Sequence, residues 1–111
     1  MRNLWGHMKE VILSADNTAK LYRVPDAVAD NLEKTCLEFS VNWIWKNPNG
    51  AKLLHESYDH QYKYASFTEK DFIEYLNKWI YPDQPSVLLR DFGCDYSEIP
   101  EEYKKIPAYL F

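Results

Sequence analysis

The chain has 111 residues, of which 46% are hydrophobic and 27% are charged, and its formal net charge is −4 at pH 7. A globular chain of this length is expected to fold as a single domain, residues 1–111, around one core. The negative charge argues against direct binding to nucleic acid, which needs a basic surface. The sequence contains neither the roughly 20 consecutive apolar residues of a membrane span nor an N-terminal secretion signal. We therefore expect a cytoplasmic protein without a membrane partner.

Aromatic residues make up 16% of the chain, so rings should fill much of the core. The two cysteines, Cys36 and Cys94, are too few for a disulfide framework. Reduced thiols in a reducing compartment are the simpler interpretation.

The N-terminal third is predicted to form an arm and a β-hairpin. We interpret residues 1–7 as a short arm that could dock through Trp5. Residues 9–15 and 18–24 have the composition of two strands, and Asp16-Asn17 between them is typical of a tight hairpin turn.

The stretch from Pro25 to Trp45 is predicted to be one long amphipathic helix that ends at residues 46–50. Its apolar stripe recurs at steps of four, four, three and four: Val28, Leu32, Cys36, Phe39 and Trp43. A second set covers much of the remaining circumference of the second half: Leu37, Val41, Ile44 and Trp45. A helix that is apolar all round is buried on more than one side. We favour coverage by the protein's own sheet, second helix or tail, and a partner protein is the alternative.

After residue 50 the pattern is weaker until a second helix begins. Residues 52–64 fit either a third strand, with Tyr58, Tyr62 and Tyr64 on one face, or a polar loop. Thr68 followed by Asp71 is a variant of the capping box, which predicts a helix over residues 68–80. Phe67 before the cap and Phe72 after it are spaced as a hydrophobic staple.

Residues 86–91 are short and apolar enough to predict a central strand. The tail, residues 93–111, is expected to be largely irregular, with one helical turn after Pro100, and its aromatic residues should dock it against the body. The whole pattern predicts an α+β domain with a mixed or antiparallel sheet and both helices on one face. Its core is expected to include Ile12, Leu32, Phe39, Trp43, Ile73, Leu76, Trp79 and Leu88.

The region around His55, Asp59 and His60 is the first candidate for chemistry. The two histidines are five residues apart, so they diverge by about 140° on a helix and point to opposite faces of a strand. They are weak metal candidates for that reason, and the favoured interpretation is polar surface. The sequence has no phosphate-binding glycine loop and no nucleophile motif, so we predict no cofactor and regard an enzyme as the less favoured class.

The strongest functional signal is an acidic run that we call the acidic segment, residues 91–102. It contains five acids and no Lys or Arg, and the candidate partner-binding residues in and beside it are Asp91, Asp95, Tyr96, Glu98, Glu101, Glu102 and Tyr103. Such a strip could steer a basic protein surface toward it while the rings anchor the contact. The alternative is a solvated tail whose aromatic residues face inward.

In size, charge and aromatic content the chain resembles small acidic bacterial immunity and inhibitor proteins, which neutralise nucleases or toxins and include inhibitors encoded by phages and mobile elements. The resemblance implies a non-enzymatic protein-binding module but assigns no functional residue. A small enzyme or ligand-binding domain that uses His55, Asp59 and His60 is the other hypothesis.

Overall fold

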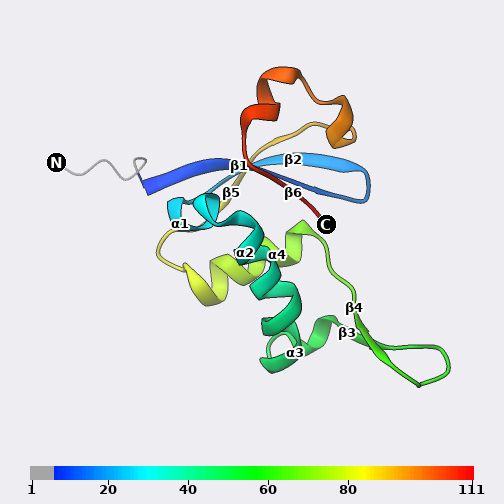
Figure 1. Ribbon diagram of the computed structural model, residues 1–111. Coiled ribbons are helices and arrows are strands. Elements are labelled where there is room, and N and C mark those ends of the chain that lie inside the picture. The colour runs from blue at the N-terminus through cyan, green and yellow to red at the C-terminus, as the bar shows by residue number, and fades with distance from the viewer. Residues whose placement is uncertain (1–6) are drawn as a thin grey trace.

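The computed structural model describes residues 7–111 and is built on a four-stranded sheet in the order β5-β2-β1-β6 (Figure 1). These strands are β1 (Met8–Ala15), β2 (Thr18–Pro25), β5 (Val87–Asp91) and β6 (Ala108–Leu110). β2 is antiparallel to both β1 and β5, whereas β6 runs parallel to β1. The predicted α+β class and the mixed sheet are therefore confirmed. The predicted arm with Trp5 lies, apart from its last residue, outside the described residues.

The hairpin of β1 and β2 closes as the sequence predicts. Ala15 pairs with Thr18, and the two residues between them have positive φ angles, 53° for Asp16 and 64° for Asn17. Two successive residues in the left-handed region define the turn that matches the twist of a two-residue hairpin, and Asp and Asn tolerate that region better than most residues.

The predicted long helix is interrupted. It consists of α1 (Asp26–Asp30), α2 (Leu32–Leu37), a π-helical stretch (Glu38–Trp43) and α3 (Ile44–Lys46). Asn31 breaks the first part, with φ −134° and ψ 44°. Its side chain donates to the carbonyl of Ala27 at 3.1 Å, because Asn side chains compete with the helix for backbone groups. The helix ends at Lys46 as predicted, since Asn47 precedes a proline and is extended.

The second helix begins where its cap predicts. The helix α4 (Glu69–Tyr75) continues as a π-helical stretch (Leu76–Ile80). The hydroxyl of Thr68 accepts from the N–H of Lys70, and Asp71 accepts from the N–H of Thr68 at 2.9 Å. Phe67 and Phe72 both lie against Phe39, at ring-centroid distances of 5.4 and 5.6 Å.

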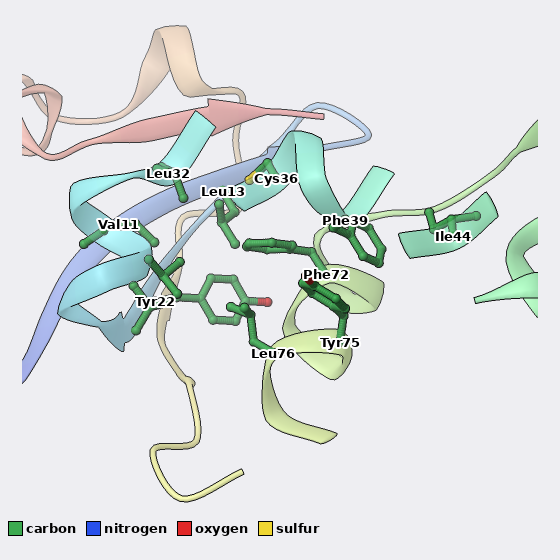
Figure 2. Close-up of a cluster of buried hydrophobic side chains, with 13 residues drawn as sticks. Val11, Leu13, Tyr22, Leu32, Cys36, Phe39, Ile44, Phe72, Tyr75 and Leu76 are labelled. Carbon is green, nitrogen blue, oxygen red and sulfur yellow. The ribbon is translucent and has the colours of Figure 1, made fainter. Parts of the chain in front are cut away.

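Both faces of the sheet are covered, which explains why β1 carries a continuous apolar run. Val11 and Leu13 face the helices, which lie on one side of the sheet, and Ile12 faces the other side (Figures 1 and 2). The larger cluster on the helical side also contains Tyr22, Val24, Val28, Ala29, Leu32, Cys36, Phe39, Ile44, Phe72, Tyr75 and Leu76. The second cluster joins Ile12 to Ala19, Leu21 and Ile99 and is closed by residues of the tail.

Two of the predicted core residues are exposed, and two others are only partly buried at the margin of the core. Trp79 and Leu88 are 47% and 48% exposed, and Trp43 and Ile73 are only half-buried. The strand β5 lies at an edge of the sheet and not at its centre, so its apolar side chains have neighbours on one side only. For Leu88, apolar character predicted burial, but the edge position of β5 leaves its side chain half exposed.

The outer face of the first helix is also uncovered. Leu37, Val41 and Trp45 are 43%, 60% and 45% exposed, so the favoured expectation that the protein itself covers them is wrong. Ile44, from the same predicted set, is fully buried.

The middle segment and the tail contain strands that the sequence left open. Residues 52–64 form neither one strand nor a loop but a short hairpin of β3 (Leu54–Glu56) and β4 (Lys63–Ala65). The tail makes two 3-10 turns, Tyr96–Glu98 and Glu101–Lys105, before β6. The predicted turn after Pro100 is therefore confirmed, and the parallel strand was not predicted.

No helix among residues 7–111 has both the length and the apolar character needed to cross a bilayer.

Candidate functional site

From Phe92 onward, the acidic segment lies over the face of the sheet opposite the helices (Figure 1). The chain turns at Gly93, whose φ of 67° lies in the left-handed region that favours glycine. Backbone bonds then fix it to the sheet: Phe92 donates to the carbonyl of Ala19 at 3.0 Å, and Ala19 donates to that of Cys94 at 2.9 Å. Ile99 anchors the middle of the segment at 3% exposure.

The aromatic rings of the segment face inward. Phe92, Tyr96 and Tyr103 are half-buried against the second cluster. The guanidinium of Arg90 lies 4.8 Å from the centroid of Phe92 and 5.4 Å from that of Tyr103, and it donates to the Tyr103 hydroxyl at 3.0 Å. Lys104 lies 5.8 Å from the ring of Tyr96. Each tyrosine among the predicted anchors therefore has a cation of the same chain beside it.

The carboxylates divide into two groups. Asp95 is half-buried and accepts from the hydroxyl of Ser97 at 2.7 Å, and this hydrogen bond, with one from the Ser97 N–H, holds the pKa of Asp95 below its usual range. Glu98, Glu101 and Glu102 are exposed, and Glu101 reaches Lys104 at 3.6 Å. Asp95 thus stabilises a turn, while the three glutamates face solvent.

Asp91 is exposed and begins the segment. One of its carboxylate oxygens accepts from the N–H of Gly93 at 2.9 Å, which supports the turn onto the sheet. The structure therefore places the predicted residues from Asp95 to Tyr103 over the face of the sheet opposite the helices, with the three glutamates in solvent and the two tyrosine rings inward. Asp91 lies on β5 and lines a groove at the start of α4 instead.

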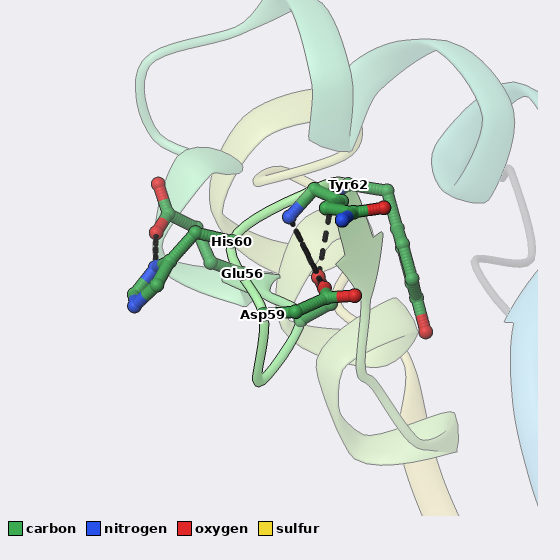
Figure 3. Close-up of polar contacts among 6 residues, drawn as sticks. Glu56, Asp59, His60 and Tyr62 are labelled. Atoms are coloured by element: carbon green, nitrogen blue, oxygen red, sulfur yellow. Dashed lines mark hydrogen bonds and ion pairs between the residues drawn. The ribbon is translucent and has the colours of Figure 1, made fainter.

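The histidine region forms the loop between β3 and β4. Ser57 is buried, and its hydroxyl donates to Asp59 at 2.6 Å while it accepts from the N–H groups of Gln61 and Tyr62 (Figure 3). The same bond to Ser57 is the main cause of the lowered pKa of Asp59. Asp59 is therefore engaged in holding the loop.

The two histidines do not converge. Nδ1 of His60 lies 2.6 Å from Glu56, on the opposite side of the loop from Asp59 (Figure 3). His55 lies 5.6 Å from Tyr64, centroid to centroid. Across residues 7–111, no three His, Cys, Asp or Glu side chains gather as metal ligands would. The geometry gives this region no assembled site.

A buried ion pair was not foreseen. Lys20 on β2 reaches Glu69 at the start of α4 at 2.7 Å, and their side chains are 12% and 4% exposed. The hydrogen bond to Glu69 is the main cause of the raised pKa of Lys20. The pair lies in a groove of about 260 Å³ that Asp91 also lines. Nothing in the sequence distinguishes these two residues from surface charges.

Both cysteines are free. Cys36 is fully buried, and burial raises its pKa to about 12, so its thiol stays protonated and is a poor nucleophile.

Comparisons with protein-family models, with curated proteins and with solved structures found no match to this chain.

Proposed function

We propose that the chain is a non-enzymatic protein-binding module, of the small acidic immunity or inhibitor kind, that meets a basic surface on its partner through the acidic segment. The observation that carries the proposal is the separation of charge from packing in that segment. Its rings and Ile99 fix the backbone on the sheet, and Glu98, Glu101 and Glu102 remain in solvent. A charged surface with a fixed backbone loses little conformational entropy when a partner binds.

The inward rings change how the segment would act. Tyr96 and Tyr103 already contact Lys104 and Arg90, so the carboxylates and not the rings would make the first contact with a partner. Exposed charges act mainly on the rate of encounter and less on final affinity. The two free thiols support a reducing compartment, the cytoplasm, for this encounter.

The test is to replace the three exposed glutamates, Glu98, Glu101 and Glu102, by glutamine. Asp91 and Asp95 are left unchanged because they support turns. A partner is first captured on the immobilised wild-type protein from a lysate of the encoding organism and identified by mass spectrometry. Association with the purified partner is then measured at low and at high salt. The triple variant should associate about tenfold more slowly at low salt, and the difference should shrink at high salt.

A matched control removes the same amount of charge elsewhere. Glu10, Glu33 and Asp83 are exposed and lie outside the acidic segment. Their change to amides should leave the association rate close to that of the wild type. Equal slowing by both triple variants would mean that net charge alone matters, and no slowing by the Glu98, Glu101 and Glu102 variant would refute a role for the segment.

A further inference from the structure

The hairpin of β3 and β4 projects from the body of the protein (Figure 1). It has two strands of three residues each, and the part of the chain that the structure describes adds no third strand to them. A two-stranded ribbon of this size is marginally stable in water by itself. Its long loop is nevertheless well defined, because the Ser57 hydroxyl holds three neighbours.

Among the described residues, β4 pairs with β3 on one side only. The hydrogen-bond pattern of the hairpin shows which backbone groups of β4 face the unpaired side. The backbone N–H of Ser57 donates to the carbonyl of Tyr62 at 2.8 Å, and the backbone N–H of Ser66 donates to the carbonyl of Leu53 at 2.9 Å. Hydrogen-bonded pairs alternate along an antiparallel ladder, so His55 and Tyr64 form the bonded pair between these two. The N–H and C=O groups of Lys63 and Ala65 therefore point away from β3, toward the open side.

The outward N–H and C=O groups of β4 can pair with those of a second, antiparallel copy of β4. When two copies of β4 lie antiparallel about a two-fold axis at Tyr64, Lys63 faces Ala65 of the second copy, and the reverse pair forms as well. Both pairs are in bonded positions, which gives four N–H···O bonds. Tyr64 then faces Tyr64 of the second copy in a non-bonded pair, where side chains approach most closely.

The side chains support this register. His55, Tyr62 and Tyr64 lie on one face of the hairpin with ring-centroid distances of 5.6 and 6.5 Å, and all three are exposed. The second copy would extend this row of rings across the axis. On the other face Lys63 lies opposite Glu56 of its own hairpin, so its charge has an opposite neighbour.

The two edges of the four-stranded sheet are less suited to pairing. The strand β5 has a register shift opposite Leu21 and Tyr22, and β6 follows directly after Pro107. Bulges and prolines are devices that keep edge strands from pairing, and β4 has neither.

We propose that two copies of this chain associate through β4, which joins their hairpins into one four-stranded antiparallel sheet around a two-fold axis at Tyr64. A strand of unrelated sequence would satisfy the backbone groups, but the second copy also supplies the ring opposite Tyr64. The strands are short, so the interface falls below the roughly 800 Å² per partner of a standard interface and the dimer is weak. This association is independent of the proposed function, because it uses a different part of the molecule.

The first test is sedimentation equilibrium of the full chain from about 10 μM to about 1 mM, the range in which a weak dimer forms. The wild type should shift from monomer to dimer across it. Tyr64→Glu places two carboxylates opposite each other on the axis and should raise the dissociation constant at least about tenfold. Tyr58→Glu is the matched control, because Tyr58 is fully exposed but lies in the loop. It should leave the dimer unchanged, and circular dichroism should show both variants folded.

The second test checks the register. In a Cys94→Ser background, Tyr64→Cys places two thiols on the axis at a separation that a disulfide can span. Mild oxidation should give a covalent dimer. Tyr62→Cys moves the thiol two residues from the axis and should not cross-link. A wild type that remains monomeric at the highest concentration, equal weakening by the two glutamate variants, or equal cross-linking of the two cysteine variants would each overturn the proposal.

Discussion

Removal of the ring at Phe39 is the sharpest test of the core. Phe39 is fully buried and has four aromatic neighbours: Trp43, Phe67, Phe72 and Tyr75 lie 6.0, 5.4, 5.6 and 5.0 Å away, centroid to centroid. Phe39→Ala should therefore cost about 4–5 kcal/mol, the upper part of the range for an emptied aromatic site, because those ring contacts are lost together with the buried area. The whole free energy of unfolding of such a domain is about 5–15 kcal/mol.

The assay is urea unfolding followed by far-UV circular dichroism, which reports mainly on the helices and the sheet. Because Phe39→Ala brings the protein close to unfolding, Phe39→Leu is measured beside it. Phe39→Leu should lower the free energy of unfolding by about 1.5 kcal/mol and leave its dependence on urea concentration unchanged. Trp79→Ala is the control, since Trp79 was predicted to be core but is 47% exposed, and it should cost less than Phe39→Ala by at least about 2 kcal/mol. Equal losses for the two alanine variants, or an unchanged midpoint for Phe39→Leu, would refute this account of the core.

Four further variants or measurements test other parts of the fold. Thr68→Ala should lower the free energy of unfolding by about 1 kcal/mol in the same assay, whereas Thr68→Ser, which keeps the capping hydroxyl, should lower it by less. Gly50→Ala should cost about 2 kcal/mol, because the added Cβ would lie 2.7 Å from a backbone atom of the first helix, and an unchanged midpoint would show that the loop can move away. Glu69→Gln should cost about 2 kcal/mol by leaving Lys20 without its counter-charge, and Lys20→Met added to Glu69→Leu should recover most of the stability. Cys36 should react with a thiol reagent at pH 8 only after unfolding, because burial raises its pKa to about 12, and rapid labelling of both cysteines in the folded protein would contradict its burial.

The parts of the fold that the sequence predicted correctly are those with local signals. The turn at Asp16-Asn17 and the cap at Thr68 each depend on a few adjacent residues and on the bonds those residues make with their own backbone. Pro25 and Pro48 bound the first helix for the same kind of reason. Such features depend on neighbouring residues and not on long-range contacts.

The features that the sequence did not predict depend on distant partners. The strand β6 pairs with β1 through Ala108 and Ile12, which lie at opposite ends of the chain, and no nearby residue signals this. The edge position of β5 follows from the same choice, since β6 takes the place beside β1. The exposure of Leu88 and Trp79 is a consequence of which faces the remaining chain is able to cover.

The acidic segment could be recognised as a charge pattern, but the direction of its side chains could not. Tyr96 and Tyr103 turn inward because the face of the sheet around Ile12 would otherwise lie open. Arg90 and Lys104 then lie over the rings. The carboxylates face outward as a result, so the burial of apolar area orients the charged surface.

Because packing and charge are separate in this segment, they can be changed independently. The three exposed glutamates contribute little to folding, since exposed charges are each worth under about 1 kcal/mol, so their amide variant should remain folded while it loses encounter rate. Joined through β4, two copies would carry two acidic segments on one particle. Two linked sites raise the apparent affinity for a partner that is itself repeated or dimeric without any new contact, provided that the geometry lets both engage. Binding of the Tyr64→Glu variant to a captured partner would then separate the effect of charge on encounter from the effect of two linked sites. The variant should keep the wild-type association rate per copy but dissociate faster from a dimeric partner.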